Sequence, residues 1–418
     1  MTETATLHDT PWLTSGSAAR VLALLNADGE EARVVGGAVR NALLRLPPGD
    51  IDIATTAVPE EVVRRAAAAR IKSVPTGIAH GTVTLVVDGQ PFEVTTLRED
   101  VETFGRKATV AFGRDWRVDA ERRDFTINGL SVDAAGVIHD HVGGLADIAQ
   151  RRVRFIGDPD RRIAEDYLRI LRFFRFSAAY GVGALDRDGY LACIRGRAGL
   201  SQLSAERIGM EMRKLLVAEN ALDAVVAMRD GGLLLPILIG VAYPATLAAM
   251  IEIERRRGLE ANAMLRLGAL AVAVTEDARR LGARLRLSNG EAKMLDSMGH
   301  RWWRLAGMDE ATAQKRLYRL GAARFRDRVM LAWARAGLGA DPTYWQRLIA
   351  LPDRWPIPSF PLKASDFIAR GIAEGPALGH VLSLAEDAWL AAGFPNDADA
   401  LDAIAEQTAA RFARDHKL

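Results

Sequence analysis

The sequence predicts an α+β protein, with an N-terminal α/β head built on a mixed sheet and an all-helical remainder. Strand-like alternation and glycine turns recur through about the first 150 residues. Beyond that point strand signals fade and helix-period patterns dominate to the end. The length of 418 residues is too great for one ordinary core and predicts two to four domains.

The head is predicted to alternate helices and strands. Pro59 suits the first turn of a helix that runs to about residue 70. An Asp88-Gly89 turn between two alternating apolar runs indicates a hairpin. The expected elements are a helix at 17–27, strands at 31–36 and 50–54, hairpin strands at 81–87 and 91–97, a mobile loop at 98–118, a second hairpin around 134–136 and a helix after Gly143-Gly144.

The remainder is predicted to be helical throughout. Four prolines between residues 352 and 361 indicate a linker before a small C-terminal helical unit. The expected helices cover 162–180, 204–219, 221–234, 261–274, 289–305, 309–320 and 396–413.

Composition narrows the function classes. A net charge of only +2 means that bulk charge does not indicate a nucleic-acid partner, so only local clusters can do so. The single cysteine, Cys193, excludes an intramolecular disulfide and fits a reducing compartment. We expect no signal peptide, because no basic start followed by an apolar run opens the chain. No uncharged apolar stretch is long enough to span a membrane, so the expectation is a cytoplasmic protein.

A glycine pair and two carboxylates suggest the chemistry. Gly36 and Gly37 lie between a predicted strand and helix, where backbone N–H groups can approach an anion. Asp50 and Asp52 flank one residue of the next predicted strand and would point to the same face. Mg²⁺ prefers such oxygen ligands and usually shares them with substrate phosphates. The pattern predicts nucleotidyl transfer.

Two further groups admit two interpretations each. Glu93, on the predicted hairpin, either lies beside the Asp50–Asp52 strand as a third acid or belongs to an exposed face. Arg122 and Arg123 either clamp a triphosphate or form a surface ion pair with Asp124.

A base-reading pair is predicted on the 162–180 helix. Asp166 and Arg169 are three residues apart, so they would lie on one face, and Arg172 and Arg175 continue that row. A carboxylate accepts hydrogen bonds and a guanidinium donates them, which matches the amino donor and ring-nitrogen acceptor of cytosine and adenine. Uracil and guanine reverse this pattern and would be rejected on the order of 10²-fold. The alternative is a solvated face with internal ion pairs.

Residues 301–328 form the clearest basic cluster of the C-terminal half. Tryptophans and a tyrosine are interleaved with the basic residues, a combination that suits RNA backbone contact with base stacking. The alternative is an ordinary basic surface over a tryptophan core. The candidates for RNA contact are Arg301, Arg304, Lys315, Arg316 and Arg319.

Several motifs, in order, resemble the class II nucleotidyltransferases, which comprise tRNA CCA-adding enzymes and bacterial poly(A) polymerases. They span about residues 30–215. The matching residues are Gly36-Gly37-x-x-Arg40, Asp50-x-Asp52, Arg122-Arg123-Asp124-x-x-x-Asn128, Gly143-Gly144-x-x-Asp147, Glu165-Asp166-x-x-Arg169 and Ser204-Ala205-Glu206-Arg207-Ile208.

The resemblance implies both an architecture and a reaction. It implies a catalytic head at 1–150, a neck at 151–220, a tRNA-binding body at 221–350 and a tail at 351–418. It implies two Mg²⁺ ions on Asp50 and Asp52, and template-independent addition of C, C and A to the tRNA 3′ end from CTP and ATP. No protein partner is indicated. The implied nucleotide contacts are Gly37, Arg40 and Arg123 for the triphosphate, Asp166 and Arg169 for the base, and Arg172 and Arg175 further along the site.

Some positions depart from the family pattern, and other activities remain open. Asn41 replaces the usual Asp after Arg40, which puts in doubt an ion pair that would orient Arg40; Arg45 and Gly129 also depart. The stretch 76–83 resembles the CCA-adding branch. The rivals are a poly(A) polymerase, an enzyme that adds only A or only CC, and a catalytically inactive RNA-binding protein.

Overall fold

The computed structural model describes residues 6–78, 81–104 and 107–416. Two of the residues in the 76–83 stretch, Ala79 and His80, therefore lie outside the described part. The chain forms two compact units. Unit 1 comprises Met1–Ala242 with Ala283–Arg286, and unit 2 comprises Tyr243–Gly282 with Leu287–Leu418.

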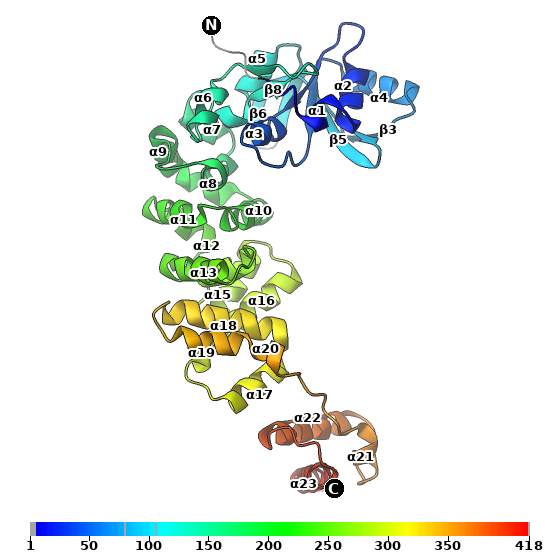
Figure 1. The fold of residues 1–418 in the computed structure, drawn as a ribbon, viewed down its shortest axis with the longest axis vertical. Helices are drawn as coiled ribbons and strands as arrows, with labels where there is room; N and C mark the ends of the chain where they lie inside the picture. The colour runs from blue at the N-terminus through cyan, green and yellow to red at the C-terminus, as the bar shows by residue number, and fades with distance from the viewer. Residues whose placement is uncertain (1–5, 79–80, 105–106, 417–418) are drawn as a thin grey trace. The chain divides into compact units, whose positions relative to one another are not determined.

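Unit 1 is built around a seven-stranded mixed sheet with the order β3-β4-β5-β2-β1-β8-β9 (Figure 1). Strands β2 and β5 run parallel, and the other adjacent pairs of this sheet are antiparallel. The predicted mixed sheet is confirmed. Its strands are β1 (Ala32–Val35), β2 (Asp52–Thr55), β3 (Lys72–Gly77), β4 (Thr82–Val87), β5 (Gln90–Thr96), β8 (Leu130–Val132) and β9 (Ile138–Asp140).

Local sequence signals explain the hairpin but not every strand. Asp88 and Gly89 both have positive φ, 51° and 77°, as a two-residue hairpin turn with the native twist requires, so the hairpin prediction is confirmed. The prediction of a mobile loop at 98–118 is wrong. That segment contains β6 (Arg98–Phe104) and β7 (Lys107–Phe112), which pair as a separate sheet, and then helix α5 (Trp116–Glu121).

Helices pack on the sheet and continue after it. Buried apolar side chains such as Val34, Ile53, Leu85 and Phe125 form the core of the head. The other helices of this part are α1 (Pro11–Thr14), α2 (Ser17–Leu25), α3 (Gly37–Leu43), α4 (Pro59–Ala68), η2 (Thr126–Asn128), α6 (Gly144–Ala149), α7 (Pro159–Glu165), α8 (Leu168–Tyr180), α9 (Arg187–Arg195), η3 (Gly196–Gln202), α10 (Ala205–Leu216), α11 (Ala221–Asp230) and α12 (Leu234–Leu238).

The chain after residue 242 is helical in its described part. Trp333 and Phe325 are among its largest buried side chains, and a separate apolar cluster around Trp389 joins the last three helices. The elements are α13 (Pro244–Arg256), α14 (Ala263–Ala271), α15 (Thr275–Arg284), α16 (Asn289–Gly299), η4 (Trp302–Leu305), α17 (Glu310–Leu320), α18 (Ala322–Ala336), α19 (Pro342–Ile349), α20 (Leu351–Arg354), α21 (Ala364–Ile368), α22 (Pro376–Ala391) and α23 (Ala398–His416).

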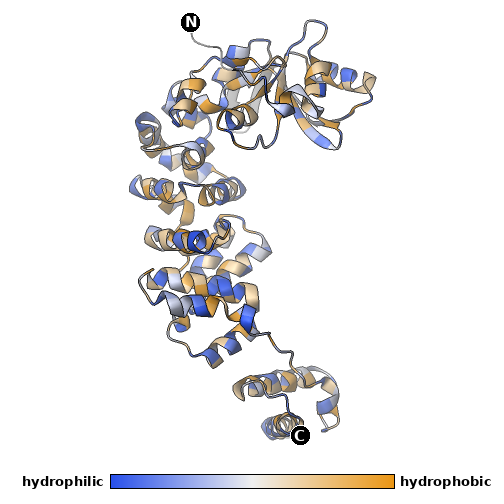
Figure 2. Ribbon diagram, viewed as in Figure 1, coloured by the Kyte–Doolittle hydropathy of each residue, from blue (hydrophilic) through white to orange (hydrophobic). Residues whose placement is uncertain are grey.

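Three predicted helices are interrupted. The segment 162–180 is divided between α7 and α8, 221–234 is divided between α11 and α12, and 289–305 is divided between α16 and η4. Helices of both units mix hydrophobic and hydrophilic residues (Figure 2). Among the described residues, none of the helices is both long and apolar enough to cross a bilayer.

Candidate active site

The glycine turn after β1 has the geometry that its sequence predicts. Gly36 has φ 69° and ψ −118°, a backbone conformation that residues with a side chain rarely adopt. A Cβ atom on Gly36 would lie 3.4 Å from Nη1 of Arg123. That distance is an ordinary contact, so the positive φ rather than a lack of space favours glycine here. The turn lies beside the Arg123 guanidinium group, where α3 begins at Gly37.

Register places two acids side by side at the start of β2. Ile53 pairs with Val94 of the parallel strand β5, so Asp52 and Glu93 precede them on neighbouring strands, facing the same side of the sheet. Both residues are exposed. The adjacency that the sequence left open for Glu93 is therefore present. Asp50 is also exposed but lies before β2, so the argument that strand alternation directs Asp50 and Asp52 to one face is wrong.

The electrostatics of Asp52 reflect this crowding. Its pKa is raised to about 6, first by loss of water around the carboxyl group, although part of the residue surface stays accessible. The charges of Glu93 and Asp50 raise the pKa further, and Arg123 opposes the shift. Carboxylates held this closely favour a proton or a cation between them.

The acids suit a metal ion only in combination with a substrate. Among the described residues, no three His, Cys, Asp or Glu side chains converge as a preformed metal cluster. The donors at Asp50, Asp52 and Glu93 are nevertheless hard oxygens, the type that Mg²⁺ prefers, and Mg²⁺ usually completes its shell with water and phosphate oxygens. The donor set therefore fits a divalent cation that is bound jointly with a nucleotide.

Arg122 and Arg123 share a buried carboxylate. Both guanidinium groups pair with Asp119, at 2.6 Å and 2.9 Å, so the alternative of a surface ion pair with Asp124 is wrong. Burial disfavours the charged form of Asp119, but the two arginines outweigh it and hold the pKa below its usual value. One edge of Arg123 is thus fixed while Nη1 lies beside Gly36.

Arg40 is buried and ties the glycine turn to the helices behind it. It donates to Oδ1 of Asn128 (2.5 Å), to Oδ1 of Asn41 (2.8 Å) and to the hydroxyl of Tyr180 (2.8 Å). Its guanidinium also lies 3.9 Å from the centre of the Tyr180 ring. Asn41 therefore accepts hydrogen bonds from Arg40 without carrying a charge.

Asp166 and Arg169 lie at a break between helices. The chain leaves helical geometry at Asp166, where φ is −157° and ψ is 107°, so the expected single helix that would place the pair on one face is wrong. The backbone N–H of Arg169 nevertheless donates to the carbonyl of Asp166 at 3.0 Å, which keeps the two residues in one turn.

Each member of the pair has its own ionic partner. Asp166 pairs with Arg207 of α10 at 2.6 Å, and Arg169 pairs with Glu165 at 2.5 Å. Sequence reasoning assigned no role to Arg207. Its place in the Ser204–Ile208 motif was the signal that could have drawn attention to it.

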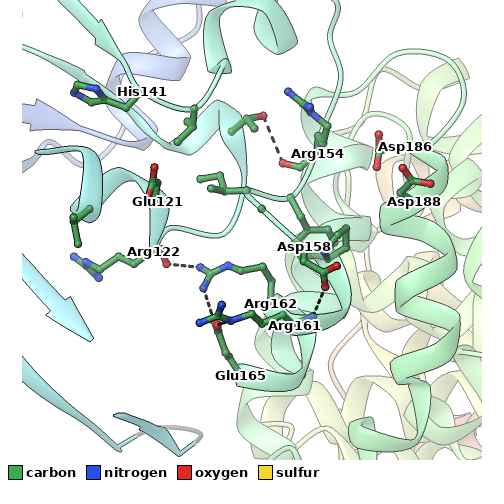
Figure 3. Close-up of a pocket in the computed structure, with 17 residues that line it drawn as sticks. Glu121, Arg122, His141, Arg154, Asp158, Arg161, Arg162, Glu165, Asp186 and Asp188 are labelled. Atoms are coloured by element: carbon green, nitrogen blue, oxygen red, sulfur yellow. Dashed lines mark hydrogen bonds and ion pairs between the residues drawn. The ribbon is translucent and has the colours of Figure 1, made fainter. Parts of the chain in front are cut away.

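Glu165 also lines a pocket of 890 Å³ (Figure 3). There Arg162 pairs with Glu165 and donates to the carbonyl groups of Arg122 and Arg123. The loop that carries Arg123 is thereby tied to the helix that carries Glu165. Of the residues predicted to contact a nucleotide, Arg122 lines this pocket, whereas Asp52, Arg123 and Asp166 do not.

Arg172 and Arg175 face buried acids. Arg172 pairs with Asp124 at 2.6 Å, and Arg175 pairs with Glu211 at 2.6 Å. Burial opposes ionisation of Asp124, yet Arg172 and Asn128 outweigh it, so its pKa is below the usual value. The guanidinium groups of both arginines also lie near the Phe176 ring, at 5.1 Å and 4.1 Å from its centre.

The five predicted RNA contacts in unit 2 divide into two groups. Arg319 pairs with Glu386 and Asp387, and Lys315 donates to the carbonyl of Ala391, so both hold α22. For Arg301, Arg304 and Arg316, no ion pair occurs within the described part of the chain.

Comparisons with known proteins found related sequences along most of the chain. A family described as "Poly A polymerase head domain" matches residues 32–154, and one described as "Probable RNA and SrmB- binding site of polymerase A" matches 192–247. The mitochondrial CCA tRNA nucleotidyltransferase 1 of Mus musculus is 32% identical over 398 residues, covering 92% of this chain and 88% of the relative. The CCA-adding enzyme of Geobacillus thermodenitrificans is 41% identical over 215 residues, or 51% of this chain and 52% of that enzyme.

A solved structure extends the similarity along nearly the whole chain. The crystal structure of the Bacillus stearothermophilus CCA-adding enzyme in complex with CTP matches with a TM-score of 0.73 and 26% identity. The match covers 97% of this chain and 99% of that one. Because the mouse relative exceeds 30% identity along most of both chains, the protein belongs to the family of CCA tRNA nucleotidyltransferases.

Proposed function

We propose that this chain adds C, C and A to the 3′ end of tRNA, using CTP and ATP and releasing pyrophosphate. The observation that carries the proposal is the sheet register that sets Asp52 beside Glu93, next to the Gly36 turn and Arg123. Relatives over most of the chain are named for this activity, and one similar structure holds CTP.

Enzymes of this family use a divalent metal. For this chain we propose two Mg²⁺ ions, held by Asp50 and Asp52 with Glu93 as a third acid of the site. When bound, such ions make the attacking 3′-hydroxyl more acidic and stabilise the leaving pyrophosphate. The carboxylates themselves would keep the attacking oxygen and the α-phosphate in line, since positioning and charge stabilisation supply most of the rate in phosphoryl transfer.

The triphosphate would lie at the glycine turn. Gly36 and Gly37 allow close approach of backbone N–H groups, and Arg123 offers the guanidinium edge that Asp119 does not occupy. Arg40 uses most of its N–H groups on Asn41, Asn128 and Tyr180. We therefore assign Arg40 mainly to orienting the turn, with direct phosphate contact limited to what remains of its donors.

Base choice would depend on Asp166 and Arg169, with Arg172 and Arg175 further along α8. The Asp166 carboxylate can accept the exocyclic amino group of cytosine or adenine, while Arg169 donates to the adjacent ring nitrogen. Arg207 and Glu165 would hold these two side chains in place before a nucleotide arrives. Uracil and guanine would place a ring N–H donor opposite the Arg169 donor. We expect this mismatch to lower their incorporation on the order of 10²-fold.

A second function is favoured by one specific observation. The family that matches residues 32–154 carries a poly(A) polymerase description, so repeated addition of A alone is the nearest rival. Enzymes that add only A or only CC, and a catalytically inactive RNA-binding protein, are further rivals.

One experiment distinguishes these candidate functions. A tRNA that lacks its three terminal nucleotides is incubated with CTP, with ATP and with both, and product lengths are resolved on a gel. We expect two additions with CTP and three with both nucleotides. A long ladder of added A residues would indicate a poly(A) polymerase. Addition of only A or only CC would indicate a partial-adding enzyme. RNA binding without any product would indicate a catalytically inactive head.

We further propose the division into a head (1–150), neck (151–220), body (221–350) and tail (351–418), with the body contacting tRNA. The cytoplasm is our proposed location, although the mouse and human relatives are mitochondrial. Cell fractionation with an antibody against the chain would distinguish the two compartments.

A further inference from the structure

A basic cluster in unit 2 has an unusual lack of counter-charge. It comprises His300, Arg301, Arg304, Arg316 and Arg328, which come from the α16–η4 connection, η4, α17 and α18. In the described residues, no carboxylate forms an ion pair with any of these five side chains. Two acids on α16 and α17 have partners outside the cluster. Glu310 pairs with Arg354, and Asp296 pairs with Arg279 at 3.6 Å.

Packing fixes the geometry of the cluster. Arg328 is only 4% exposed and donates from Nη2 to the carbonyl of His300. The next residue, Arg301, has φ 46°, a left-handed conformation, and its carbonyl accepts the N–H of Arg304 at 3.1 Å. A buried arginine thus holds the turn that presents Arg301 and Arg304, both exposed, to solvent.

Two buried donor atoms in the cluster are unsatisfied. Nε of Arg316 and Nε of Arg328 are shielded from solvent and have no hydrogen-bond partner in the described residues. Burial lowers the pKa of Arg316, and the charges of Arg304 and Arg301 lower it further. Burial also lowers the pKa of His300, with Arg328, Arg301 and Arg316 adding to the effect against Asp296. A bound anion would relieve this repulsion.

An exposed aromatic ring lies in the same turn. Trp303 is 52% exposed, whereas Trp302 is partly covered, with Arg335 lying 4.7 Å from its ring centre. Exposed aromatic rings beside guanidinium groups suit single-stranded or looped RNA, because every base has a face that can stack. A protein or lipid partner would not account for the combination of an isolated ring and unpaired guanidinium groups as directly.

We propose that Arg301, Arg304 and Arg316, supported by Arg328, bind an RNA phosphodiester while Trp303 stacks on an adjacent unpaired base. Lys315 and Arg319 belong instead to the contact with α22 and take no part in RNA binding. The inference rests on the proposed tRNA activity, and it names one contact surface for the RNA outside the head.

The test measures RNA binding separately from catalysis. We expect Arg304→Gln to weaken affinity for tRNA lacking its CCA end and to lower the slope of log affinity against log salt by about 1. Trp303→Ala should weaken binding by at least about fivefold with little change in that slope. Fluorescence anisotropy of labelled tRNA over a salt series, without nucleotide, gives both values. In CMP incorporation, KM for tRNA should rise while KM for CTP stays unchanged.

Two matched controls separate the site from general charge and stability. Arg255→Gln removes one charge from an exposed α13 residue that pairs with Glu252, and it should leave affinity and slope unchanged. Arg319→Gln should lower the melting temperature without altering the salt slope. Equal weakening by the Arg255 and Arg304 variants, or unchanged binding in both site variants, would overturn the proposal. A wild-type chain that binds tRNA through this site yet adds no nucleotide would refute only the proposed activity.

Discussion

Arg207 offers a direct test of how the base-reading pair is held. Its Nη2 lies 2.6 Å from Oδ2 of Asp166, and the two side chains are only 17% and 25% exposed. A hydrogen bond between charged groups contributes about 1.5–3 kcal/mol when it is shielded from water, and partial exposure favours the lower end. Since about 1.4 kcal/mol corresponds to a factor of ten in rate, Arg207→Gln should cost about tenfold in discrimination.

The expected defect concerns base selection rather than phosphate binding. In Arg207→Gln, Asp166 keeps its hydrogen bond from the N–H of Leu168 but loses the charged partner that fixes its second oxygen. The ratio of kcat/KM for CTP to that for UTP should therefore fall about tenfold. Arg207→Lys retains a positive charge with a single donor and should restore part of the ratio.

Single-turnover incorporation into tRNA lacking its CCA end, with CTP and UTP in parallel, supplies these ratios. Arg286→Gln is the matched control, because Arg286 is 73% exposed and lies 3.6 Å from Glu206 on the same helix as Arg207. An unchanged CTP-to-UTP ratio in a folded Arg207→Gln variant would show that Arg207 does not position Asp166 for base reading.

Three other predictions test the metal site, base selection and the effect of a buried acid on stability. Asp52→Ala should bring CMP and AMP incorporation below detection while tRNA affinity in anisotropy stays within a few-fold, and near-normal turnover would remove Asp52 from the metal site. Asp166→Ala combined with Arg169→Ala should relax rejection of UTP and GTP on the order of 10²-fold in the same incorporation assay, whereas intact rejection would contradict the base-reading role. Burial raises the pKa of Asp327 to about 6, because the buried site favours the protonated carboxyl group. The contribution of this residue to folding stability is therefore full below about pH 4 and is lost as the pH rises through about 6. Asp327→Asn should therefore raise the melting temperature at pH 7, by a gain of up to about 3 kcal/mol, and leave it unchanged near pH 4; equal shifts at both pH values would refute this.

The parts of the fold that the sequence predicted correctly depend on local signals. The Gly36 turn needs only a conformation that glycine adopts, and the Asp88-Gly89 hairpin needs only positive φ at both positions. Strand β3 escaped prediction because Lys72–Gly77 contains a proline and lacks clear alternation. The β6–β7 pair escaped because polar residues dominate β6 and because Gly105 and Gly113, on either side of β7, are typical of loops.

The break at Asp166 shows a limit of periodicity. Neither Pro nor Gly marks it, and the residues around it are compatible with a helix. What ends α7 is a set of competing bonds: Asp166 accepts the N–H of Leu168, and Arg207 of α10 pairs with its other oxygen. The second of these comes from 41 residues away, beyond the reach of any local window.

Sequence alone also cannot show which residues of a basic cluster are already paired with acids. Residues 301–319 read as a single basic surface in sequence, yet Glu386 and Asp387 on α22 neutralise Arg319. Arg304 lies in the same stretch and has no carboxylate partner within the described residues. Availability for RNA is therefore decided by acids that are distant in sequence. For that reason Arg304 is a stronger candidate than Arg319, although composition alone makes the two equivalent.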